Sequence, residues 1–363
     1  MRHGCCAEIN ISALRHNVTL IKQAVPHKIA AVVKANAYGH GLATVVAALE
    51  NLVDTFAVAF MEEAVVLRSL TRQPILVLEG CFDLDELQSA ALLDLSLVVH
   101  SDYQIRALEK FQGNARFKIW LKINSGMNRL GFAQQDFAMA YQRLLKAPQC
   151  ASLTLMSHLS CADERQSALT HEQISNFYAL IGDGKHSVSL ANSAAILAWP
   201  QAMLSSHEQW LRPGIMLYGA SPFEETNGKE EGLRPVMTLR STLIAQRELK
   251  TGECVGYGAS WCASRPSRIG VVAIGYADGY PRHAPSGTPV LVNKQRAPLV
   301  GRVSMDMITV DLTDLPDARI GDSVVLWGEG LPVEEIARWA GTISYDLLTA
   351  VTARVARREV DIP

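Results

Sequence analysis

The sequence lacks several features that would place a protein in a broad class. No apolar run among its 363 residues reaches the length of a membrane span, so we expect no membrane segment. Its 34 Lys and Arg do not exceed its 36 Asp and Glu, which argues against a nucleic-acid binder, because such proteins usually carry a basic surplus. Internal repeats and low-complexity tracts are also missing. What remains is a globular chain long enough for two domains with large cores.

Cysteine is scarce and follows no metal or disulfide pattern. The seven Cys are an odd number and contain no C-x-x-C motif. This pattern favours reduced thiols over a disulfide framework or a zinc site, and we expect no metal. The start of the chain becomes polar again at Glu8 and has no apolar signal-peptide core, so we expect a cytoplasmic protein.

Over the first two thirds of the chain, short β-rich runs alternate with runs whose apolar residues recur at helical spacing. The strands are expected at Ile29–Lys34, Thr55–Phe60, Ile75–Leu78, Leu97–Val99, Phe117–Ile123, Ser152–Ser157, Ser187–Ala191 and Leu211–Leu217. The helices are expected at Leu42–Asn51, Glu62–Leu70, Asp85–Leu93, Tyr103–Phe111, Asp136–Leu145 and Glu172–Ile181. Eight such units in roughly 200 residues predict a parallel (β/α)8 barrel of the TIM type. The alternative, a doubly wound sheet, would need G-x-G-x-x-G after its first strand, and KANAYG at residues 34–39 does not match.

The last third has the pattern of a small, mainly antiparallel β domain. A polar linker at Ser221–Pro235 precedes strands expected at Leu239–Arg247, Arg268–Ile274, Pro289–Val292, Ile308–Leu312 and Ser323–Trp327, and a helical tail at Val333–Ala340 and Tyr345–Val355. We therefore expect a barrel domain over residues 1–233 and a β domain over residues 234–363. A leading strand at residues 7–11 is expected to pair with the β domain, with Ser12 as the N-cap of the helix that follows.

Lys34 is the most informative single residue. It closes a strand-like apolar run and is followed at once by a Gly-containing turn. A lysine is seldom buried unless it is paired or chemically used. A buried amine can attack a carbonyl and hold a cofactor as a Schiff base, whereas the alternative is a lysine that extends from a barrel mouth into solvent. The residue alone does not decide between them.

Six motifs carry a resemblance that extends over nearly the whole chain. They are AVVKANAYGHG at residues 31–41, SGMNRLG at 125–131, RPGIMLYG at 212–219, GYGA at 256–259, GYADGY at 275–280 and GRVSMD at 301–306. Together, and in this order, they resemble the alanine racemases. These are pyridoxal phosphate (PLP) enzymes built as a barrel followed by a β domain. The expected polar residues also follow barrel strands, where the catalytic residues of such barrels lie.

The resemblance implies two bases that act on opposite faces of the α-carbon. Lys34 carries PLP and is one base, and Tyr257 of the partner subunit is the other, in a homodimer with composite sites. A phenol, with a pKa near 10, needs help as a base at neutral pH. His158 and Arg212 are expected to supply it, with Arg212 facing the pyridine nitrogen. Taken alone, Tyr257 is more often a packing residue, and His158 a core histidine.

The resemblance also implies the residues that hold the cofactor and the substrate. The cofactor contacts are Lys34, Tyr38, His158, Asn192, Ser193, Arg212, Gly214, Ile215 and Tyr345. The substrate contacts are Arg129, Met305, Tyr276 and Asp306. A cation and backbone donors suit a carboxylate, and a glycine backbone can approach a phosphate closely. Lys122 matches a lysine that is carbamylated in some relatives, where it holds the arginine.

The departures from the family pattern are few. Ser157-His158-Leu159-Ser160 replaces the more usual S-H-F-A, and Asn124-Ser125 stands where D-T is common. The chain is thus identified as a member of the alanine racemases, interconverting L- and D-alanine and supplying D-alanine for peptidoglycan. A racemase of broader range, a barrel-only PLP carrier and a PLP decarboxylase with a catalytic Cys remain as alternatives. Tyr257 and Met305 argue against the last two.

Overall fold

The computed structural model describes residues 4–24, 26–184 and 186–362. They divide into two compact units. The barrel unit comprises Val18–Ala37 and Val45–Leu217, and the β unit comprises Met1–Asn17, Tyr38–Thr44 and Tyr218–Pro363. Within the described ranges, no helix is both long and apolar enough to cross a membrane.

Eight parallel strands form the core of the barrel unit, as the sequence predicts, but the eighth ends at Leu211, and residues 215–217 of the expected strand lie in a 3-10 turn. They are β2 (Lys28–Val32), β3 (Thr55–Val58), β4 (Ile75–Val77), β5 (Leu95–Val99), β6 (Phe117–Lys122), β7 (Cys150–Met156), β8 (Ser187–Ser189) and β9 (Trp210–Leu211). Their order is β8-β7-β6-β5-β4-β3-β2-β9. Parallel bridges from Val188 to Gln209 and from Asn192 to Arg212 join the two ends, so the barrel is nearly closed. Strands β3, β4 and β5 are buried at every residue, which explains their continuous apolar runs.

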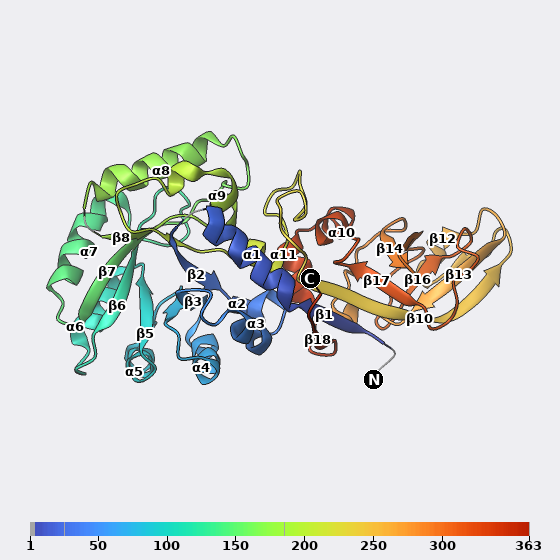
Figure 1. Cartoon of the computed structure of the whole chain (residues 1–363), viewed down its shortest axis with the longest axis horizontal. Coiled ribbons are helices and arrows are strands. Elements are labelled where there is room, and N and C mark those ends of the chain that lie inside the picture. Colours follow the sequence, from blue (N-terminus) through green and yellow to red (C-terminus); the bar gives the residue numbers. More distant parts are fainter. Residues whose placement is uncertain (1–3, 25, 185, 363) are drawn as a thin grey trace. The chain divides into compact units, whose positions relative to one another are not determined.

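Helices cover the outer face of these strands (Figure 1). They are α3 (Leu42–Leu49), α4 (Met61–Leu70), α5 (Leu84–Leu92), α6 (Asp102–Lys110), α7 (Gln134–Lys146), α8 (Ala168–Ile181) and the short α9 (Ser193–Ala198), with 3-10 turns η1 (Pro200–Ala202) and η2 (Ile215–Tyr218). In α6 the buried residues are Gln104, Ile105 and Leu108, so a single stripe faces the strands. The remaining face is polar and meets solvent.

Helix α1 (Ile11–Ala24) begins one residue before the predicted cap. Asn10 performs the capping, because its Oδ1 accepts the backbone N–H of Ala13 at 3.2 Å. Ser12 already lies inside the helix and donates its hydroxyl to Asp361. The prediction of Ser12 as the N-cap is therefore wrong.

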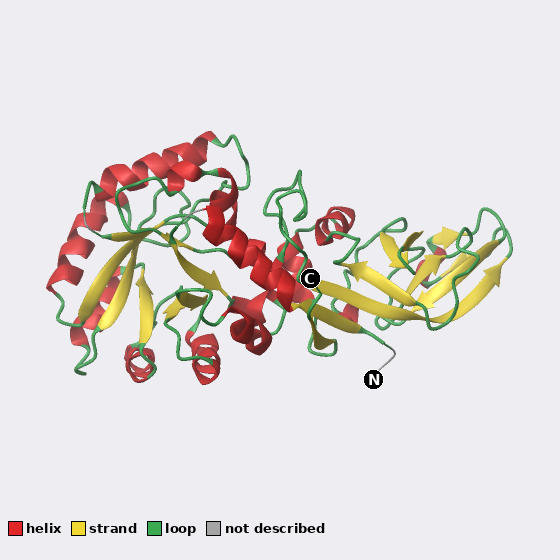
Figure 2. Ribbon diagram, viewed as in Figure 1, coloured by secondary structure: helices red, strands yellow, loops and turns green. Residues whose placement is uncertain are grey.

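The β unit is built on a mainly antiparallel sheet (Figure 2). Its strands are β1 (Cys6–Asn10), β10 (Met237–Leu249), β13 (Ser267–Val272), β14 (Pro289–Val292), β15 (Gln295–Pro298), β16 (Ile308–Asp311), β17 (Ser323–Trp327) and β18 (Ala356–Val360). A separate pair is formed by β11 (Cys254–Val255) and β12 (Trp261–Cys262). Helices α10 (Val333–Ala340) and α11 (Ser344–Ala350) and the 3-10 turns η3 (Tyr257–Ala259) and η4 (Tyr276–Asp278) complete the unit.

The leading strand joins this sheet, as predicted. Ala7 of β1 lies opposite Leu239 of β10 in an antiparallel pair, and Glu8 lies opposite Arg358 of β18 in a parallel pair. Arg240 of β10 also pairs with the carboxylate of Glu8. The first residues of the chain are thereby tied to its last strand.

The predicted helical tail at Tyr345–Val355 is wrong beyond Ala350, where α11 ends. Val351 and Val355 are both buried, and their spacing of four residues imitates a helix. The backbone instead turns, because the N–H of Thr352 donates to the carbonyl of Asp278 at 3.1 Å. The chain then enters β18, which the sequence did not predict.

The prediction of reduced thiols is wrong for two of the seven cysteines. Cys254 and Cys262 form a disulfide that joins β11 to β12. The free cysteines are Cys5, Cys6, Cys81, Cys150 and Cys161. The pair escaped prediction because the two cysteines are eight residues apart in sequence and meet only when the intervening turn closes.

Candidate active site

Lys34 follows β2, which ends at Val32 rather than at the lysine itself. It opens α2 (Lys34–Tyr38), a single turn in which the four residues after Lys34 are left-handed. Ala35, Asn36, Ala37 and Tyr38 have φ angles of 53°, 53°, 54° and 51°. This conformation costs an L-residue roughly 1–2 kcal/mol, and four consecutive examples without glycine are unusual. Backbone strain of this kind concentrates at functional sites, and here it lies directly beside Lys34.

Glu63 holds the strained turn in place. Its carboxylate accepts the backbone N–H of Ala35 at 2.6 Å and that of Ala59 at 2.7 Å. Within the turn, the N–H of Ala37 donates to the carbonyl of Val33 at 2.9 Å. Glu63 was missed by the sequence reasoning. Its only signal is its position as the third residue of α4, where a carboxylate commonly reaches back to free amides.

Arg212 lies buried at the end of β9 and contacts His158. Its guanidinium donates to the carbonyls of Ser157 at 2.6 Å and Leu190 at 3.3 Å, and to the hydroxyl of Ser189. The same nitrogen that bonds Ser157 lies 3.4 Å from His158 Nδ1. Burial lowers the pKa of Arg212 to about 10, so it stays charged at neutral pH.

His158 is neutral in this setting. Burial, followed by the charges of Arg212, Lys122, Arg129 and Lys34, holds its pKa well below the usual value. With Nδ1 facing a guanidinium that can only donate, the ring proton must sit on Nε2. His158 is therefore a hydrogen-bond donor through Nε2.

Lys122, at the end of β6, belongs to the same cluster of cations. Burial lowers its pKa to about 8, Glu79 opposes that shift, and Arg212, Arg129 and Lys34 add to it. The cations come from the ends of β2, β6 and β9 and from the loop after β6. Such a surplus of positive charge suits an anionic ligand or a carbamylated lysine.

The loop that carries Arg129 is shaped by one of the two departures from the family pattern, Asn124-Ser125. Asn124 Oδ1 accepts the N–H groups of Gly126 at 3.1 Å and Asn128 at 3.0 Å, which folds the loop back on itself. Ser125 Oγ lies 2.8 Å from Ser157 Oγ. Ser125 thus contacts the residue before His158, while Arg129 itself is exposed.

Ser193 and the segment after Arg212 form a second polar cluster of the barrel unit. Ser193 Oγ accepts the N–H of Gly214 at 2.9 Å and that of Met216 at 3.4 Å. Asn192 caps α9, because its Oδ1 accepts the N–H of Ala195 at 3.0 Å. A hydroxyl that accepts in this way can also donate its own hydrogen, which suits an anion such as a phosphate.

Tyr38 and Tyr345, which the sequence assigns to phosphate binding, lie together in the β unit. The ring of Tyr38 stacks on that of Tyr218 at 4.8 Å and lies 6.1 Å from that of Tyr345. The ring of His40 also packs on that of Tyr218, with 4.5 Å between the ring centroids. Burial raises the pKa of Tyr38 to about 12, so its phenol remains a donor. Tyr218 was missed as a support for Tyr38, although it lies within the RPGIMLYG motif.

The remaining predicted residues share an exposed part of the β unit. Tyr257 is 68% exposed, Met305 52% and Tyr276 40%. The N–H of Tyr276 donates to the carbonyl of Ser304 at 3.1 Å, and that of Ala277 to Met305 at 3.0 Å. The Tyr276 and Met305 segments are therefore one hydrogen-bonded structure.

Asp306 is held by an arginine that the sequence reasoning missed. Arg354 Nη2 lies 2.7 Å from Asp306 Oδ1, and Arg354 Nε lies 3.4 Å from Asp278. Asp278 in turn accepts the N–H of Gly275 at 3.0 Å. One guanidinium thus bridges the two loops that carry Tyr276 and Met305.

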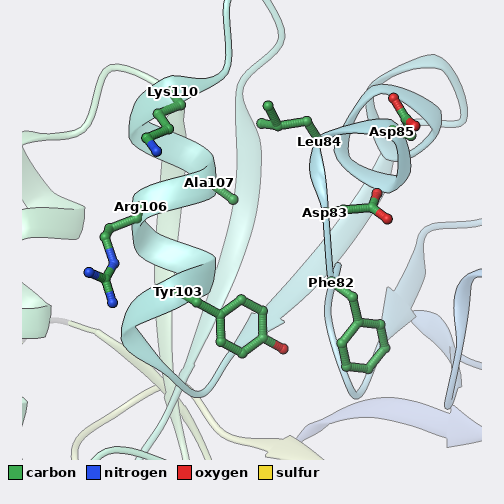
Figure 3. A pocket seen from close by; sticks show the side chains of 8 residues that line it. All are labelled: Phe82, Asp83, Leu84, Asp85, Tyr103, Arg106, Ala107 and Lys110. Atoms are coloured by element: carbon green, nitrogen blue, oxygen red, sulfur yellow. The ribbon is translucent and has the colours of Figure 1, made fainter.

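A surface hollow of about 640 Å³ lies elsewhere in the barrel unit, between α6 and the loop and first turn of α5 (Figure 3). None of the predicted site residues lines it. Two of its charged groups have other partners, since Asp83 caps α5 through the N–H of Glu86 and Arg106 pairs with Asp102 at 2.6 Å. The hollow therefore does not compete with the cation cluster as a candidate active site.

The donor set of the barrel unit fits a cofactor that carries an aldehyde, an aromatic nitrogen and a phosphate. Lys34 offers a half-buried amine, Arg212 a rigid charged donor, and Ser193 a hydroxyl. Arg129 and Lys122 supply positive charge that a carboxylate or phosphate would balance.

Two family models match the chain: alanine racemase, N-terminal domain, over residues 9–222, and alanine racemase, C-terminal domain, over residues 236–359. An alanine racemase of Stutzerimonas stutzeri is 52% identical over 98% of this chain and 98% of its own. The crystal structure of biosynthetic alanine racemase from Pseudomonas aeruginosa superposes with a TM-score of 0.95 at 50% identity, covering 99% of both chains. That of alanine racemase from Bartonella henselae with covalently bound pyridoxal phosphate has a TM-score of 0.89 at 29% identity, covering 98% of this chain and 99% of that one.

Proposed function

This chain belongs to the alanine racemase family, and we propose that Lys34 and Tyr257 divide its reaction between them. It is a PLP-dependent alanine racemase. PLP, when bound, supplies an electron-withdrawing ring that lowers the cost of removing the α-proton of alanine. The observation that carries the residue assignment is the placement of Lys34 beside the cations Arg212, Arg129 and Lys122 in one barrel.

Lys34 has two tasks in this proposal. Its amine would hold the cofactor covalently, and as a free amine it would remove or return the proton on the D face of the α-carbon. The left-handed turn and the Glu63 carboxylate restrain the backbone on one side of the lysine. A base must be held within about 0.5 Å of its working position, and a restrained backbone serves that end.

Tyr257 of the partner subunit is the base on the L face. His158 would assist it, since its neutral ring carries the donor hydrogen on Nε2 while Nδ1 lies 3.4 Å from the Arg212 guanidinium. Arg212 serves as a permanent donor to the pyridine nitrogen, since a guanidinium does not give up its proton at neutral pH. The carbonyls of Ser157 and Leu190 accept hydrogen bonds from Arg212 and so fix the orientation of its guanidinium plane.

The substrate carboxylate is bound by the guanidinium of Arg129 and the backbone N–H of Met305 of the partner subunit. Tyr276 narrows the entrance, and Asp306 orients its loop through Arg354. Lys122 is the candidate for carbamylation, because a pKa of about 8 leaves more neutral amine to react with carbon dioxide than a solvated lysine has. A carbamate on Lys122 would place one negative charge among these cations, and that charge would hold the Arg129 guanidinium.

The phosphate is bound by the hydroxyls of Tyr38, Ser193 and Tyr345 and the backbone N–H groups of Gly214 and Ile215. Asn192 contributes by capping α9, which sets the position of Ser193. We assign residues 1–233 to the PLP-binding barrel domain, apart from the leading strand, and residues 234–363 to the β domain. The protein acts as a homodimer in the cytoplasm and supplies D-alanine for peptidoglycan.

The two-base assignment is tested by exchange of the α-hydrogen with deuterated solvent, measured separately from L- and D-alanine. Tyr257→Phe should lower exchange from L-alanine by about 100-fold or more, because a positioned base contributes at least that much, and should largely spare exchange from D-alanine. Tyr103→Phe is the matched control, since Tyr103 is also exposed and lies outside the proposed site. Equal losses from both enantiomers would contradict the assignment.

A further inference from the structure

We propose that Cys254 and Cys262 are a reversible thiol–disulfide site, acted on by dithiols and small disulfides, that sets how firmly the Tyr257 turn is held. The proposal rests on the proposed role of Tyr257 as the base on the L face. It concerns the hairpin β11–η3–β12, defined here as residues 254–262. This hairpin presents Tyr257 at its tip, with the disulfide at its base.

The two strands of the hairpin are too short to hold it by themselves. Each has two residues, and the pair forms its own sheet, separate from the large sheet of the β unit. Cys254 lies opposite Cys262, and Val255 opposite Trp261. A two-stranded hairpin is marginally stable in water even when it is longer. The hairpin therefore depends on contacts beyond its own ladder.

The two cross-strand pairs of the hairpin lie on opposite faces, because successive side chains of a strand point to opposite sides. Val255 is buried in a small apolar cluster with Ile269 and Val300, and Trp261 packs against that cluster. Because neighbouring residues of a strand point to opposite faces, the cysteines face away from the cluster, and both are exposed. The apolar face is held by packing, and the solvent face is held by the disulfide.

The turn itself has few internal restraints. Gly256, Gly258 and Ala259 have φ angles of 72°, 72° and 46°, and in the single chain all residues from 256 to 260 are exposed. Arg302 gives the clearest contact from outside, since a Cβ at Gly258 would lie 3.1 Å from its Nη1. The Arg302 guanidinium thus lies against the turn at Gly258. Removal of the disulfide should therefore loosen this segment selectively.

The chemistry is an exchange between thiols and a disulfide. In reduction, a thiolate of a dithiol attacks one sulfur, the Cys254–Cys262 bond breaks, two protein thiols form, and the dithiol becomes its own disulfide. In oxidation, the two protein thiols pass two electrons and two protons to a small disulfide such as glutathione disulfide, which becomes two thiols. Exposed disulfides are the readily exchanged ones, and those of cytosolic proteins are usually transient or redox-sensing.

The expected effect is a change in the population of the closed hairpin. When oxidised, the turn holds Tyr257 in place. When reduced, a marginal hairpin is closed for only part of the time, so exchange from L-alanine should fall by roughly 2- to 10-fold. Exchange from D-alanine, which Lys34 starts in the barrel, should change much less. This asymmetry separates the proposal from a general loss of folding or of cofactor.

The experiment uses the cofactor-loaded enzyme in three states: oxidised with glutathione disulfide, reduced with dithiothreitol and then desalted without oxygen, and reoxidised. Alkylation followed by peptide mass spectrometry should find thiols at 254 and 262 only in the reduced state. Amide hydrogen exchange of residues 252–263 should rise on reduction and fall again on reoxidation. The ratio of L- to D-alanine exchange rates should follow the same cycle.

Two variants complete the design. Cys254→Ser with Cys262→Ser should behave as the reduced enzyme in every state and should not respond to dithiothreitol. Cys150→Ser with Cys161→Ser, at partly exposed free cysteines, should respond as the wild type does. Because reduction of the wild type is reversible, the result does not depend on any variant folding.

Two results would overturn the proposal. One is free thiols at both positions after treatment with glutathione disulfide. The other is an unchanged L-to-D ratio although the disulfide has been reduced and Tyr257→Phe lowers exchange from L-alanine. If Tyr257→Phe itself has no selective effect, it is the assignment of Tyr257 as a base that fails, and a change in hairpin hydrogen exchange would still report the redox site.

Discussion

Ala35→Gly should stabilise this protein, which is the reverse of what a glycine usually does. Ala35 is the first residue of the left-handed turn after Lys34, with φ 53° and ψ 51°, and its side chain is exposed. Its methyl group therefore contributes little packing, while its backbone conformation is one that an L-residue disfavours. Glycine reaches the same conformation without that steric cost.

The magnitude follows from two opposing effects. Relief of the left-handed conformation should stabilise the folded state by roughly 1–2 kcal/mol. The greater freedom of glycine in the unfolded chain should take back roughly 0.5–1 kcal/mol. The net change is a stabilisation of up to about 1.5 kcal/mol. The hydrogen bond from the Ala35 N–H to Glu63 is kept, because it does not involve the side chain.

Ala138→Gly provides the matched control. Ala138 is also exposed, but it lies within the right-handed helix α7, where glycine should cost about 1 kcal/mol. The assay is urea unfolding of the cofactor-free protein with both variants beside the wild type, so that cofactor affinity does not enter the comparison. The two identical chemical changes should differ by about 1–2 kcal/mol in the free energy of unfolding. Equal destabilisation by both would show that the turn beside Lys34 stores no strain.

Four further predictions follow from the site. Borohydride should fix PLP on Lys34 alone, and Lys34→Ala should lose both bound chromophore and activity; label on another lysine, read by peptide mass spectrometry, would refute the assignment. Mixing inactive Lys34→Ala with inactive Tyr257→Phe should restore roughly a quarter of wild-type activity, because random subunit exchange makes about half the dimers mixed and each mixed dimer has one intact site of two. If no activity returns although subunit exchange is confirmed, each chain builds its own site. Arg354→Gln and Asp306→Asn should each raise the KM for both enantiomers with a smaller change in kcat, and the two effects should not add, because the residues form one ion pair. The control, Arg265→Gln at an exposed ion pair with Asp314, should leave KM and kcat unchanged. The free energy of unfolding should rise by about 3 kcal/mol between pH 8 and 10.5 through Lys122, whose pKa is about 8 in the folded state and 10.5 in the unfolded chain. In that pH window the folded state binds fewer protons than the unfolded state. The rise, measured without cofactor or carbon dioxide, should be absent in Lys122→Met.

The barrel could be predicted because its signal is local. Strands buried on both faces, such as β4 and β5, appear in the sequence as continuous apolar runs, and the helices between them repeat their apolar residues at helical spacing. The rule that functional side chains follow the carboxyl ends of barrel strands then pointed to Lys34, His158 and Arg212, each of which follows a barrel strand in the structure. Each of these steps uses residues close together in the chain.

What could not be predicted depends on partners far away in the chain. The left-handed turn contains no glycine between residues 35 and 38 to announce it, and it is stabilised by Glu63, 28 residues away. Strand β18 reads Ala-Arg-Arg-Glu-Val, which has little apolar character, and it forms only because β1, about 350 residues earlier, offers it a free edge. Local propensity carries no information about either partner.

The two proposed bases are positioned by different physical means, and this difference has a consequence. Lys34 is restrained from within the barrel, by a strained backbone and the Glu63 carboxylate. Tyr257 sits on an exposed turn, and its position is set by the Val255 cluster, by Arg302 and by a cross-link that thiols can open. Perturbation of the hairpin should therefore act first on proton removal from L-alanine, and perturbation of the left-handed turn first on removal from D-alanine. A racemase built in this way can lose one of its two proton transfers while the other continues, so net racemisation alone would not reveal which base has moved.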